Sequence, residues 1–213
     1  MVRETKIPGA TIERIALYLR SLEELLDKGV PLISSDKLAS LCGVNSAQVR
    51  KDLSYFGEFG VRGLGYEIHD LLKAIRGILA LDRPWRLGIV GVGNMGTALI
   101  RHEKFFKRGY RFVAAFDSDP EKIGKKLVHN LIIQPMSEIK KVAGALKIEI
   151  GVITTPSSQA QAVADMLVDA GIRSILNFSP IQVRPPKGKG CLVENVDFTV
   201  KLDNLAYHLS KIH

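Results

Sequence analysis

Cysteine is scarce in this sequence, and long apolar runs are absent. The 213 residues include two cysteines, Cys42 and Cys191, which lie too far apart to form a CxxC motif or a metal knuckle. Such cysteine usage is typical of a reducing compartment, and we predict no metal site. The longest apolar stretch, residues 87–93, is far too short to span a bilayer, and residues 1–10 contain no signal-peptide core. We therefore expect a cytoplasmic protein with no membrane partner.

Internal repeats and low-complexity tracts are also missing. The composition is 46% hydrophobic and 24% charged, which is ordinary for a globular domain and excludes disordered, collagen-like and coiled-coil chains. The net charge is +8, but residues 1–85 hold 12 Lys/Arg against 11 Asp/Glu, whereas residues 86–213 hold 18 against 11. The basic excess therefore does not by itself locate a nucleic-acid-binding segment.

A change in hydrophobic pattern divides the chain near residues 81–85. Before it, apolar residues recur at helical spacing; after it, short β-rich runs alternate with helical stretches. Pro84 disfavours helical geometry in the residue before it, which suits a linker. The pattern predicts an α/β protein with a helical domain over 1–82, a parallel-sheet domain over 83–194 and a C-terminal helix over 195–213.

The first domain has the pattern of a helix-turn-helix. A long amphipathic helix with Thr11 as its N-cap precedes two short helices. The first can be capped by Ser34-Ser35 and ends at Leu41, and the second is capped by Asn45. Gly43 permits a left-handed turn between them, and Gln48 can complete a capping box. The expected core residues of this pair are Leu38, Leu41, Val44 and Leu53. Two short helices around a tight glycine turn are typical of DNA-binding domains.

The second short helix is expected to present a polar face to DNA. Its outward residues offer hydrogen bonds and charge to base edges and phosphates: Ser46, Gln48, Arg50, Lys51 and Ser54. Residues 56–66 then place four glycines among aromatics, which suggests a β-hairpin wing with Arg62 at a tip that enters a minor groove. The alternatives are a structural three-helix domain with a solvated polar face, and a glycine-rich surface loop in place of the wing.

The second domain opens with a glycine motif between a predicted strand and a predicted helix. Residues 86–90 form the strand, and the motif reads Gly91-Val92-Gly93-Asn94-Met95-Gly96. The helix is expected to turn four residues inward: Ala98, Leu99, Phe105 and Phe106. A second strand, 112–116, ends at Asp117, 21 residues after the last glycine. Together these features are the full dinucleotide fingerprint of a Rossmann domain.

Each motif position has a physical reason. Gly91 makes the tight turn, Gly93 lets a pyrophosphate approach the backbone, and Gly96 lets helix and strand pack closely. The pyrophosphate meets the helix N-terminus, with its free N–H groups and partial positive charge. Asp117 would accept hydrogen bonds from the adenosine ribose, and its charge favours NAD(H) over NADP(H). The alternatives are a Rossmann-like fold that has lost its ligand, or one that binds coenzyme A.

Further strands are predicted at 131–133, 150–153 and 174–176. Loops 154–157 and 177–180 directly follow two of these strands, so both should line the nicotinamide end of the pocket. No pair of residues has the pattern of a catalytic constellation, the five histidines are scattered, and the Rossmann segment leaves no room for a substrate domain. We therefore predict a sensor of its ligand and not an enzyme. The main alternative is a small NAD-dependent oxidoreductase with an N-terminal dimerisation domain.

The C-terminal segment carries an apolar helical stripe: Leu202, Leu205, Ala206, Leu209 and Ile212. Such a helix packs on its own domain or crosses to a second subunit. Helix-turn-helix proteins usually read two half-sites as symmetric dimers, so we favour a domain-swapped helix in a homodimer.

The sequence also resembles the redox-sensing transcriptional repressors of the Rex family over nearly its whole length. The most specific match is QVRKDLSYFGEFG at residues 48–60, continuing into RGxGY at 62–66. Supporting matches are the glycine motif at 91–96, FDSDP at 116–120, ILNFSP at 175–180 and VENVD at 193–197. The resemblance implies a homodimer that binds palindromic operator DNA while NAD⁺ dominates the NADH/NAD⁺ pool and leaves it when NADH rises.

The resemblance also implies roles for individual residues. The operator contacts would be Ser46, Gln48, Arg50, Lys51 and Tyr55, with Arg62 on the wing. The glycine motif and Asp117 would hold the adenosine and pyrophosphate. The nicotinamide would be surrounded by Thr155, Pro156, Asn177, Phe178 and Pro180, with Phe198 reaching it from the partner subunit. Arg14 and Asp197 would link the domains. His102 stands where some family members have Tyr.

Overall fold

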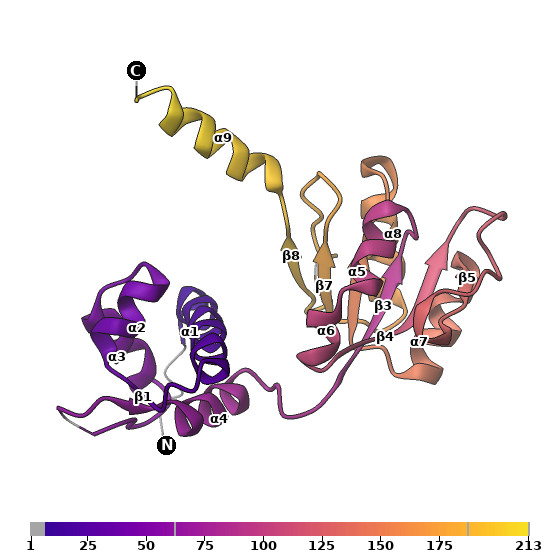
Figure 1. The fold of residues 1–213 in the computed structure, drawn as a ribbon. Helices are drawn as coiled ribbons and strands as arrows, with labels where there is room; N and C mark the ends of the chain where they lie inside the picture. Colours follow the sequence, from indigo (N-terminus) through magenta and orange to yellow (C-terminus); the bar gives the residue numbers. More distant parts are fainter. Residues whose placement is uncertain (1–6, 62, 187, 213) are drawn as a thin grey trace. The chain divides into compact units, whose positions relative to one another are not determined.

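The computed structural model describes residues 7–61, 63–186 and 188–212, so the predicted wing-tip residue Arg62 lies outside the described part of the chain. The chain divides into two compact units, Met1–Arg83 and Pro84–His213. Figure 1 shows the first as a group of helices and the second as a sheet with helices, followed by one further helix.

The N-terminal unit is helical, with one short antiparallel sheet. Its helices are α1 (Gly9–Asp27), α2 (Ser35–Cys42), α3 (Ser46–Ser54) and α4 (Ile68–Ile78). Strands β1 (Leu32–Ile33) and β2 (Tyr66–Glu67) pair antiparallel. The helices enclose fully buried apolar side chains that include Ile15, Tyr18, Leu19, Leu22, Leu38, Ile68 and Ile75. The predicted helix-turn-helix pair is thus α2 and α3, supported by α1 and α4.

The predicted caps of the helix-turn-helix are confirmed. Ser34 Oγ accepts a hydrogen bond from the backbone N–H of Lys37 at 3.1 Å, and Asn45 Oδ1 accepts one from Gln48 at 2.8 Å. Gly43 ends α2 in the left-handed conformation with φ +67°. These local hydrogen bonds satisfy helix-end groups that have no partner within the helix, which explains why short segments form helices here.

Three details of this unit differ from the sequence expectation. Thr11 does not cap α1, because the helix begins at Gly9 and the Thr11 side chain is buried against α3. Leu41 is not a core residue, since it is 46% exposed, and Val44 is half-buried. Gln48 does not complete a capping box; its Nε2 donates instead to Asp52 Oδ1 at 2.8 Å. The Thr11 outcome follows from a contact between α1 and α3, and the Gln48 outcome from a bond within α3.

The segment after α3 reverses direction as a tight hairpin. The backbone N–H of Val61 donates to the carbonyl of Gly65 at 2.9 Å, and the N–H of Gly65 donates back at 3.0 Å. Strand β2 follows directly and pairs with β1. This hairpin is the predicted wing.

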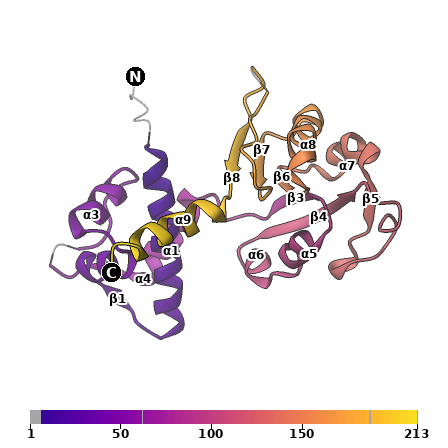
Figure 2. The same cartoon turned by 90° about the horizontal axis from the view of Figure 1, so that it is seen from above.

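The C-terminal unit contains a parallel sheet with the strand order β5-β4-β3-β6-β7-β8. Its strands are β3 (Trp85–Val90), β4 (Tyr110–Asp117), β5 (Ile133–Pro135), β6 (Ile150–Ile153), β7 (Ser174–Asn177) and β8 (Leu192–Asn195). Helices α5 (Asn94–Arg101) and α6 (Glu103–Lys107) cover one face, and α7 (Ile139–Leu146) and α8 (Ser157–Asp169) cover the other (Figure 2). Two apolar clusters fill these two interfaces, as a doubly wound Rossmann sheet requires.

The helix after the glycine motif is shorter than expected. It breaks at His102, which ends α5 and caps α6 by accepting the N–H of Lys104 at Nδ1. Of the four residues expected to face inward, Ala98 and Phe106 are exposed, and the buried residues of α5 are Gly96 and Ile100. Strand β5 begins at Ile133, two residues later than the expected 131. Strand β8 was not predicted.

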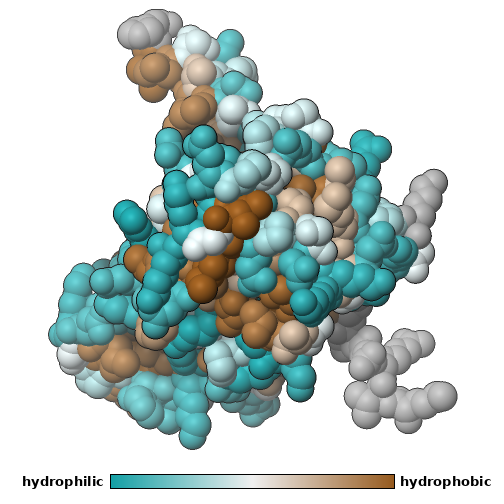
Figure 3. All heavy atoms as spheres, turned by 90° about the vertical axis from the view of Figure 1, so that its right-hand side faces the viewer, coloured by the Kyte–Doolittle hydropathy of each residue, from teal (hydrophilic) through white to brown (hydrophobic). Residues whose placement is uncertain are grey.

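Helix α9 (Phe198–Leu209) has no buried residue. Its large apolar side chains, among them Phe198, Leu202, Leu205 and Leu209, are each more than half exposed. In Figure 3 this segment, at the top of the view, carries brown apolar surface beside teal hydrophilic surface. Within the described ranges no helix combines the length and apolarity needed to cross a bilayer.

Candidate functional site

A cavity of about 520 Å³ lies at the carboxyl ends of β3, β4, β6 and β7. Eight of the predicted cofactor residues line it: Gly91, Gly93, Met95, Asp117, Thr155, Pro156, Phe178 and Pro180. The structure adds Ser118, Asp119, Lys122, Met136, Thr154, Gln159 and Ser179. Five predicted residues are not among its lining: Val92, Asn94, Gly96, Asn177 and Phe198. The cavity thus collects four loops that are distant in sequence.

The glycine motif shapes one wall of this cavity. Gly91 has φ +95°, and a Cβ there would lie 2.9 Å from the carbonyl of Thr154. A Cβ on Gly96 would clash with the backbone oxygen of Gly91, so helix and strand pack as closely as predicted. Gly93 has no atom within 4 Å of such a Cβ, and it precedes α5 without any side-chain cap. An open glycine before an uncapped helix N-terminus is suited to a phosphate group.

Asp117 lies at the end of β4 and is buried. Its Oδ2 accepts the backbone N–H of Val92 at 2.8 Å and faces Lys122 Nζ at 3.2 Å, while its Oδ1 accepts the N–H of Asp119 at 3.0 Å. Burial alone would raise the pKa of Asp117, but the two backbone hydrogen bonds and Lys122 outweigh it and lower the pKa below its ordinary value. The carboxylate is therefore charged at neutral pH and also braces the glycine loop.

Lys122 and Asp119 are pocket residues that the sequence analysis missed. Lys122 Nζ lies 3.2 Å from Asp117 and 3.6 Å from Asp119, so one ammonium is shared between two carboxylates. Asp119 Oδ1 also accepts the N–H of Glu121 at 2.9 Å. The FDSDP segment carried the signal, because a second acid two residues after the first falls on the same loop.

The opposite wall is apolar with a few polar atoms. Phe178 and Pro180 follow β7, and Thr155 and Pro156 follow β6. Ser179 Oγ donates to the carbonyl of Thr155 at 2.5 Å, which ties the two loops together. Thr155 Oγ1 is buried and has no hydrogen-bond partner among the described residues. An unpaired buried hydroxyl in a cavity wall is available to a polar ligand group.

Two predicted nicotinamide contacts have other surroundings. Asn177 is 0% exposed, and its side chain bonds to protein atoms beside the pocket. Phe198, the first residue of α9, is exposed, and its ring centroid lies 6.5 Å from that of Phe178 in the same chain. His102 is exposed at the α5–α6 junction and is not a lining residue of the cavity.

Five of the six predicted DNA-contacting residues lie on α3 and its C-cap, and the sixth, Arg62, is outside the described residues. Lys51 and Arg50 are exposed, and Arg50 Nη1 donates to Ser35 Oγ on α2 at 2.8 Å. Ser46 and Tyr55 are half-buried. Gln48 is half-buried and held by Asp52, so its amide is oriented by the protein before any ligand arrives.

Asp52 is a fully buried carboxylate at the α1–α3 contact. Its oxygens accept from Arg14 Nε at 2.6 Å, Arg14 Nη2 at 2.7 Å and Tyr18 OH at 2.8 Å. Thr11 and Gln48 also donate to it. Burial would raise the pKa of Asp52, but the hydrogen bonds from Arg14, Tyr18 and Gln48 lower it to about 2. Arg14 therefore has an ion-pair partner within its own unit, and its predicted link to Asp197 stays a prediction.

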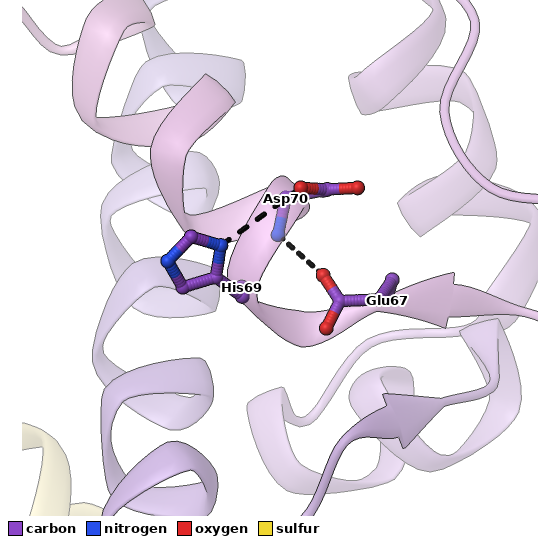
Figure 4. Close-up of side chains that lie close together, drawn as sticks. All are labelled: Glu67, His69 and Asp70. Atoms are coloured by element: carbon purple, nitrogen blue, oxygen red, sulfur yellow. Dashed lines mark hydrogen bonds and ion pairs between the residues drawn. The ribbon is translucent and has the colours of Figure 1, made fainter.

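One group of potential metal ligands is present among the described residues. The ligand atoms of Glu67, His69 and Asp70 lie within 4.8 Å of one another, and all three side chains are exposed (Figure 4). Glu67 Oε2 accepts the backbone N–H of Asp70 at 2.6 Å and so caps α4. The cluster is explained as a helix cap, and we infer no metal site from it.

A helix-turn-helix with a hairpin in one unit, and a Rossmann cavity in the other, define the class of ligand-responsive transcriptional regulators. Residues 6–54 match the family model "Putative DNA-binding protein N-terminus", and residues 82–181 match "CoA binding domain". A redox-sensing transcriptional repressor Rex from Syntrophobacter fumaroxidans is 57% identical over 205 residues, covering 96% of this chain and 97% of the relative. The chain belongs to the Rex family of redox-sensing transcriptional repressors.

Other relatives agree. The Rex repressor from Maridesulfovibrio salexigens is 46% identical, with 99% of this chain and 100% of the relative covered. The crystal structure of RSP, a Rex-family repressor, with β-NAD⁺ and operator DNA has a TM-score of 0.90 at 36% identity, covering 97% of this chain and 94% of that chain. The complex of RSP with β-NADH has a TM-score of 0.86 at 34% identity, covering 97% and 96%. These findings confirm the predicted repressor and the fold, and they favour it over the oxidoreductase alternative.

Proposed function

We propose that this chain is a homodimeric repressor that binds palindromic operator DNA when NAD⁺ dominates and is released by NADH. The observation that carries the proposal is the combination, in one Rex-family chain, of an α3 reading helix and a cavity built around the glycine motif. The RSP structures hold β-NAD⁺ with operator DNA in one case and β-NADH in another, which supports both ligands. A protein that regulates transcription in this way would act in the cytoplasm, where the operator is.

The cavity residues fit a dinucleotide. The N-terminus of α5 and the open Gly93 would hold the pyrophosphate, together with Asn94 and Met95 of the same loop. Asp117, whose carboxylate accepts the backbone N–H of Val92, would face the adenosine ribose. Phe178, Pro180 and Pro156 would border the nicotinamide, and the unpaired Thr155 hydroxyl would supply a hydrogen bond there. Phe198 of a second subunit would complete this end in the dimer.

The apolar border gives a physical reason for redox discrimination. NAD⁺ carries a positive nicotinamide ring, whereas the ring of NADH is neutral. Burying a charge without a partner is costly, so a wall of Phe178, Pro156 and Pro180 favours the reduced ring. Only the difference in affinity between the DNA-competent state and the released state can shift the equilibrium. Couplings of about 1–3 kcal/mol, roughly 5–150-fold in affinity, are typical.

The test is operator binding under separate titration with NADH and NAD⁺. A palindromic duplex selected from a random pool in the presence of NAD⁺ serves as the probe, and fluorescence anisotropy gives its Kd. We expect NADH to weaken binding and NAD⁺ not to. Operator complexes that survive saturating NADH unchanged would contradict the proposal.

Lys51→Ala provides the matched test of the reading helix. It should weaken operator binding and reduce the slope of log K against log salt by about 1, because one phosphate contact is lost. Its control, Lys73→Ala, removes the same charge from the exposed face of α4 and should leave both quantities unchanged. NADH affinity should stay within about threefold for both variants, since neither residue lies in the Rossmann unit.

Coenzyme A is the second ligand candidate, because the family model over residues 82–181 is named for it. The two ligands are separated by competition. If coenzyme A displaces NADH from the purified protein and also releases the operator at a lower concentration than NADH does, coenzyme A is the effector. The carboxylates Asp117 and Asp119 at the predicted ribose end favour the dinucleotide, since the 3′-phosphate of coenzyme A would meet them.

A further inference from the structure

Asn177 and Asn195 form a hydrogen-bonded pair at the carboxyl ends of β7 and β8. The two residues are register partners on these parallel strands, and Asn177 Nδ2 donates to Asn195 Oδ1 at 2.9 Å. The backbone N–H of Val196 donates to the carbonyl of Asn177 at 2.8 Å. The strands are therefore joined at their last residues by both side chain and backbone.

On one side, Asn177 holds the loop that lines the cavity. Its Oδ1 accepts the backbone N–H of Ser179 at 2.9 Å, and its Nδ2 donates to the carbonyl of Ile181 at 2.8 Å. Ser179 in turn binds the carbonyl of Thr155. Because the Asn177 amide is fully buried and its acceptor and donors are used within the protein, it acts on the cavity through this loop.

On the other side, Asn195 lies at the base of α9. Its Oδ1 also accepts the N–H of Val183 at 2.9 Å, and its Nδ2 donates to the Val183 carbonyl at 3.3 Å. Val196 and Asp197 alone separate Asn195 from Phe198, where α9 begins. The Asp197 carboxylate accepts the N–H of Thr199 at 2.9 Å, so the start of the helix is fixed within two residues of the pair.

A ring contact connects the same two regions. Phe178, which lines the cavity, lies 6.5 Å from Phe198 between ring centroids, with the planes tilted by 31°. A displacement of Phe178 or Ser179 would therefore be transmitted to the β8–α9 junction both by the amide pair and by this ring contact. Hydrogen-bonded networks at low dielectric are stiff, because breaking one bond leaves a buried polar group unpaired.

We propose that Asn177 and Asn195 are positioning residues that couple occupation of the cavity to the setting of α9. The inference rests on the proposed function and adds a structural link between the cavity and α9. A ligand that moves the 178–180 loop moves Asn177, and the Asn177–Asn195 bond passes that movement to the segment from which α9 departs. Neither asparagine touches the ligand or the DNA in this scheme.

The decisive variant is Asn195→Ala, which removes the bond to Asn177 and both bonds to Val183. We measure the NADH Kd, the operator Kd without NADH, and the operator Kd at saturating NADH. The ratio of the last two is the coupling. We expect this ratio to fall by about tenfold, while the NADH Kd stays within about threefold. If the wild-type ratio is itself below about ten, we expect the ratio of the variant to be 1. Asn195→Asp keeps the Oδ1 acceptor for Asn177 and Val183, so it should retain more of the ratio than Asn195→Ala.

Gln161→Ala is a closely matched control. The Gln161 amide makes the same kind of paired bonds with the neighbouring residue of the same loop, accepting the N–H of Arg184 at 3.1 Å and donating to its carbonyl at 2.9 Å. It has no bond to Asn177. Its loss should leave the coupling ratio unchanged. An equal fall in both variants would mean that the loop only needs to be stable, and would overturn the proposal.

A second measurement needs no variant and covers the case in which Asn195→Ala does not fold. Hydrogen exchange of the wild-type chain should change on NADH addition at residues 192–199 as well as at 177–183, but not at 161–165 of α8. A response confined to 177–183 would overturn the inference. A wild-type protein whose operator affinity ignores NADH would instead contradict the proposed function itself, so the two failures are distinguishable.

Discussion

At the scale of single residues, Asp117 combines a structural bond with a predicted binding role. Its carboxylate accepts two backbone N–H groups and pairs with Lys122 across 3.2 Å. Lys122 is thereby kept from presenting free positive charge at the ribose end of the cavity. Discrimination against a 2′-phosphate then depends on the balance of one ammonium and two carboxylates, and not on Asp117 alone.

Replacing Asp117 should shift this balance. We expect Asp117→Ala to lower NADH affinity by about tenfold or more, because a charge-assisted hydrogen bond is lost. NADPH should lose less affinity than NADH, since Lys122 is freed to meet the 2′-phosphate. Titration calorimetry with both nucleotides measures the ratio. Adding Lys122→Ala should remove this difference between the two nucleotides; if the double variant keeps the shifted NADH/NADPH ratio, Lys122 does not carry the effect.

The sequence was sufficient to predict which loops surround the cavity, but not which side chains face it. The strand–glycine–helix order located Gly91, Gly93 and Asp117, because these roles follow from chain geometry. Asn177, predicted as the first residue of a loop, is the last residue of β7, and its amide is used by Ser179, Ile181 and Asn195. That outcome depends on β8, a strand of four residues without a clear periodic pattern.

At the scale of helices, the α1–α3 contact is organised by Asp52. Three of its donors, Thr11, Arg14 and Tyr18, lie on one stripe of α1, and the fourth, Gln48, precedes it by one turn on α3. The network fixes the rotation of α3 against α1 and so determines which residues of α3 point outward. Sequence periodicity predicted both helices but not this contact, because a buried aspartate interrupts the apolar pattern and pairs across 38 residues of chain.

Asp52→Asn should destabilise the N-terminal unit by about 3 kcal/mol, because it breaks a buried ion pair whose arginine keeps some contact with water. The effect should depend on acid. With a folded pKa of about 2 against an ordinary 3.8, the wild-type carboxylate stabilises the fold above pH 4 and loses this contribution as the pH falls toward 2. Hydrogen exchange of the α1 and α3 amides at pH 7 and in acid measures both the loss of stability and its dependence on pH. A variant as acid-dependent as the wild type would show that another group is responsible.

The caps of α2 and α3 were predicted more reliably than the continuity of the helix after the glycine motif. Ser34, Gly43 and Asn45 form local caps whose partners lie within three to five residues, so spacing alone identifies them. The break at His102 has no such signal. Its imidazole caps α6 over two residues, and the ring packs edge-on against Phe105 at 5.4 Å, which periodicity does not report.

At the scale of the whole molecule, the ligand-binding unit and the DNA-binding unit of one chain act together through the dimer. Two half-sites of a palindrome require two reading helices at a fixed spacing, so a dimer converts small changes in geometry into large changes in affinity. Helix α9 exposes a row of large apolar side chains, since none of its described residues is buried. The predicted exchange of this helix would bury them against a second copy.

Charge placed on the apolar stripe of α9 should therefore separate assembly from ligand binding. We expect Leu202→Glu combined with Leu205→Glu to produce monomers in analytical ultracentrifugation and to weaken operator binding by about 100-fold or more, because the second half-site no longer adds to the first. The matched control is Asn204→Glu, which places a negative charge on the face of the same helix opposite the stripe and should leave the dimer intact. The Rossmann cavity stays folded in both, so NADH should still bind, with reduced affinity if Phe198 of the partner contributes. Double-variant dimers of wild-type stability would mean that α9 packs on its own chain and that the two copies meet through another surface.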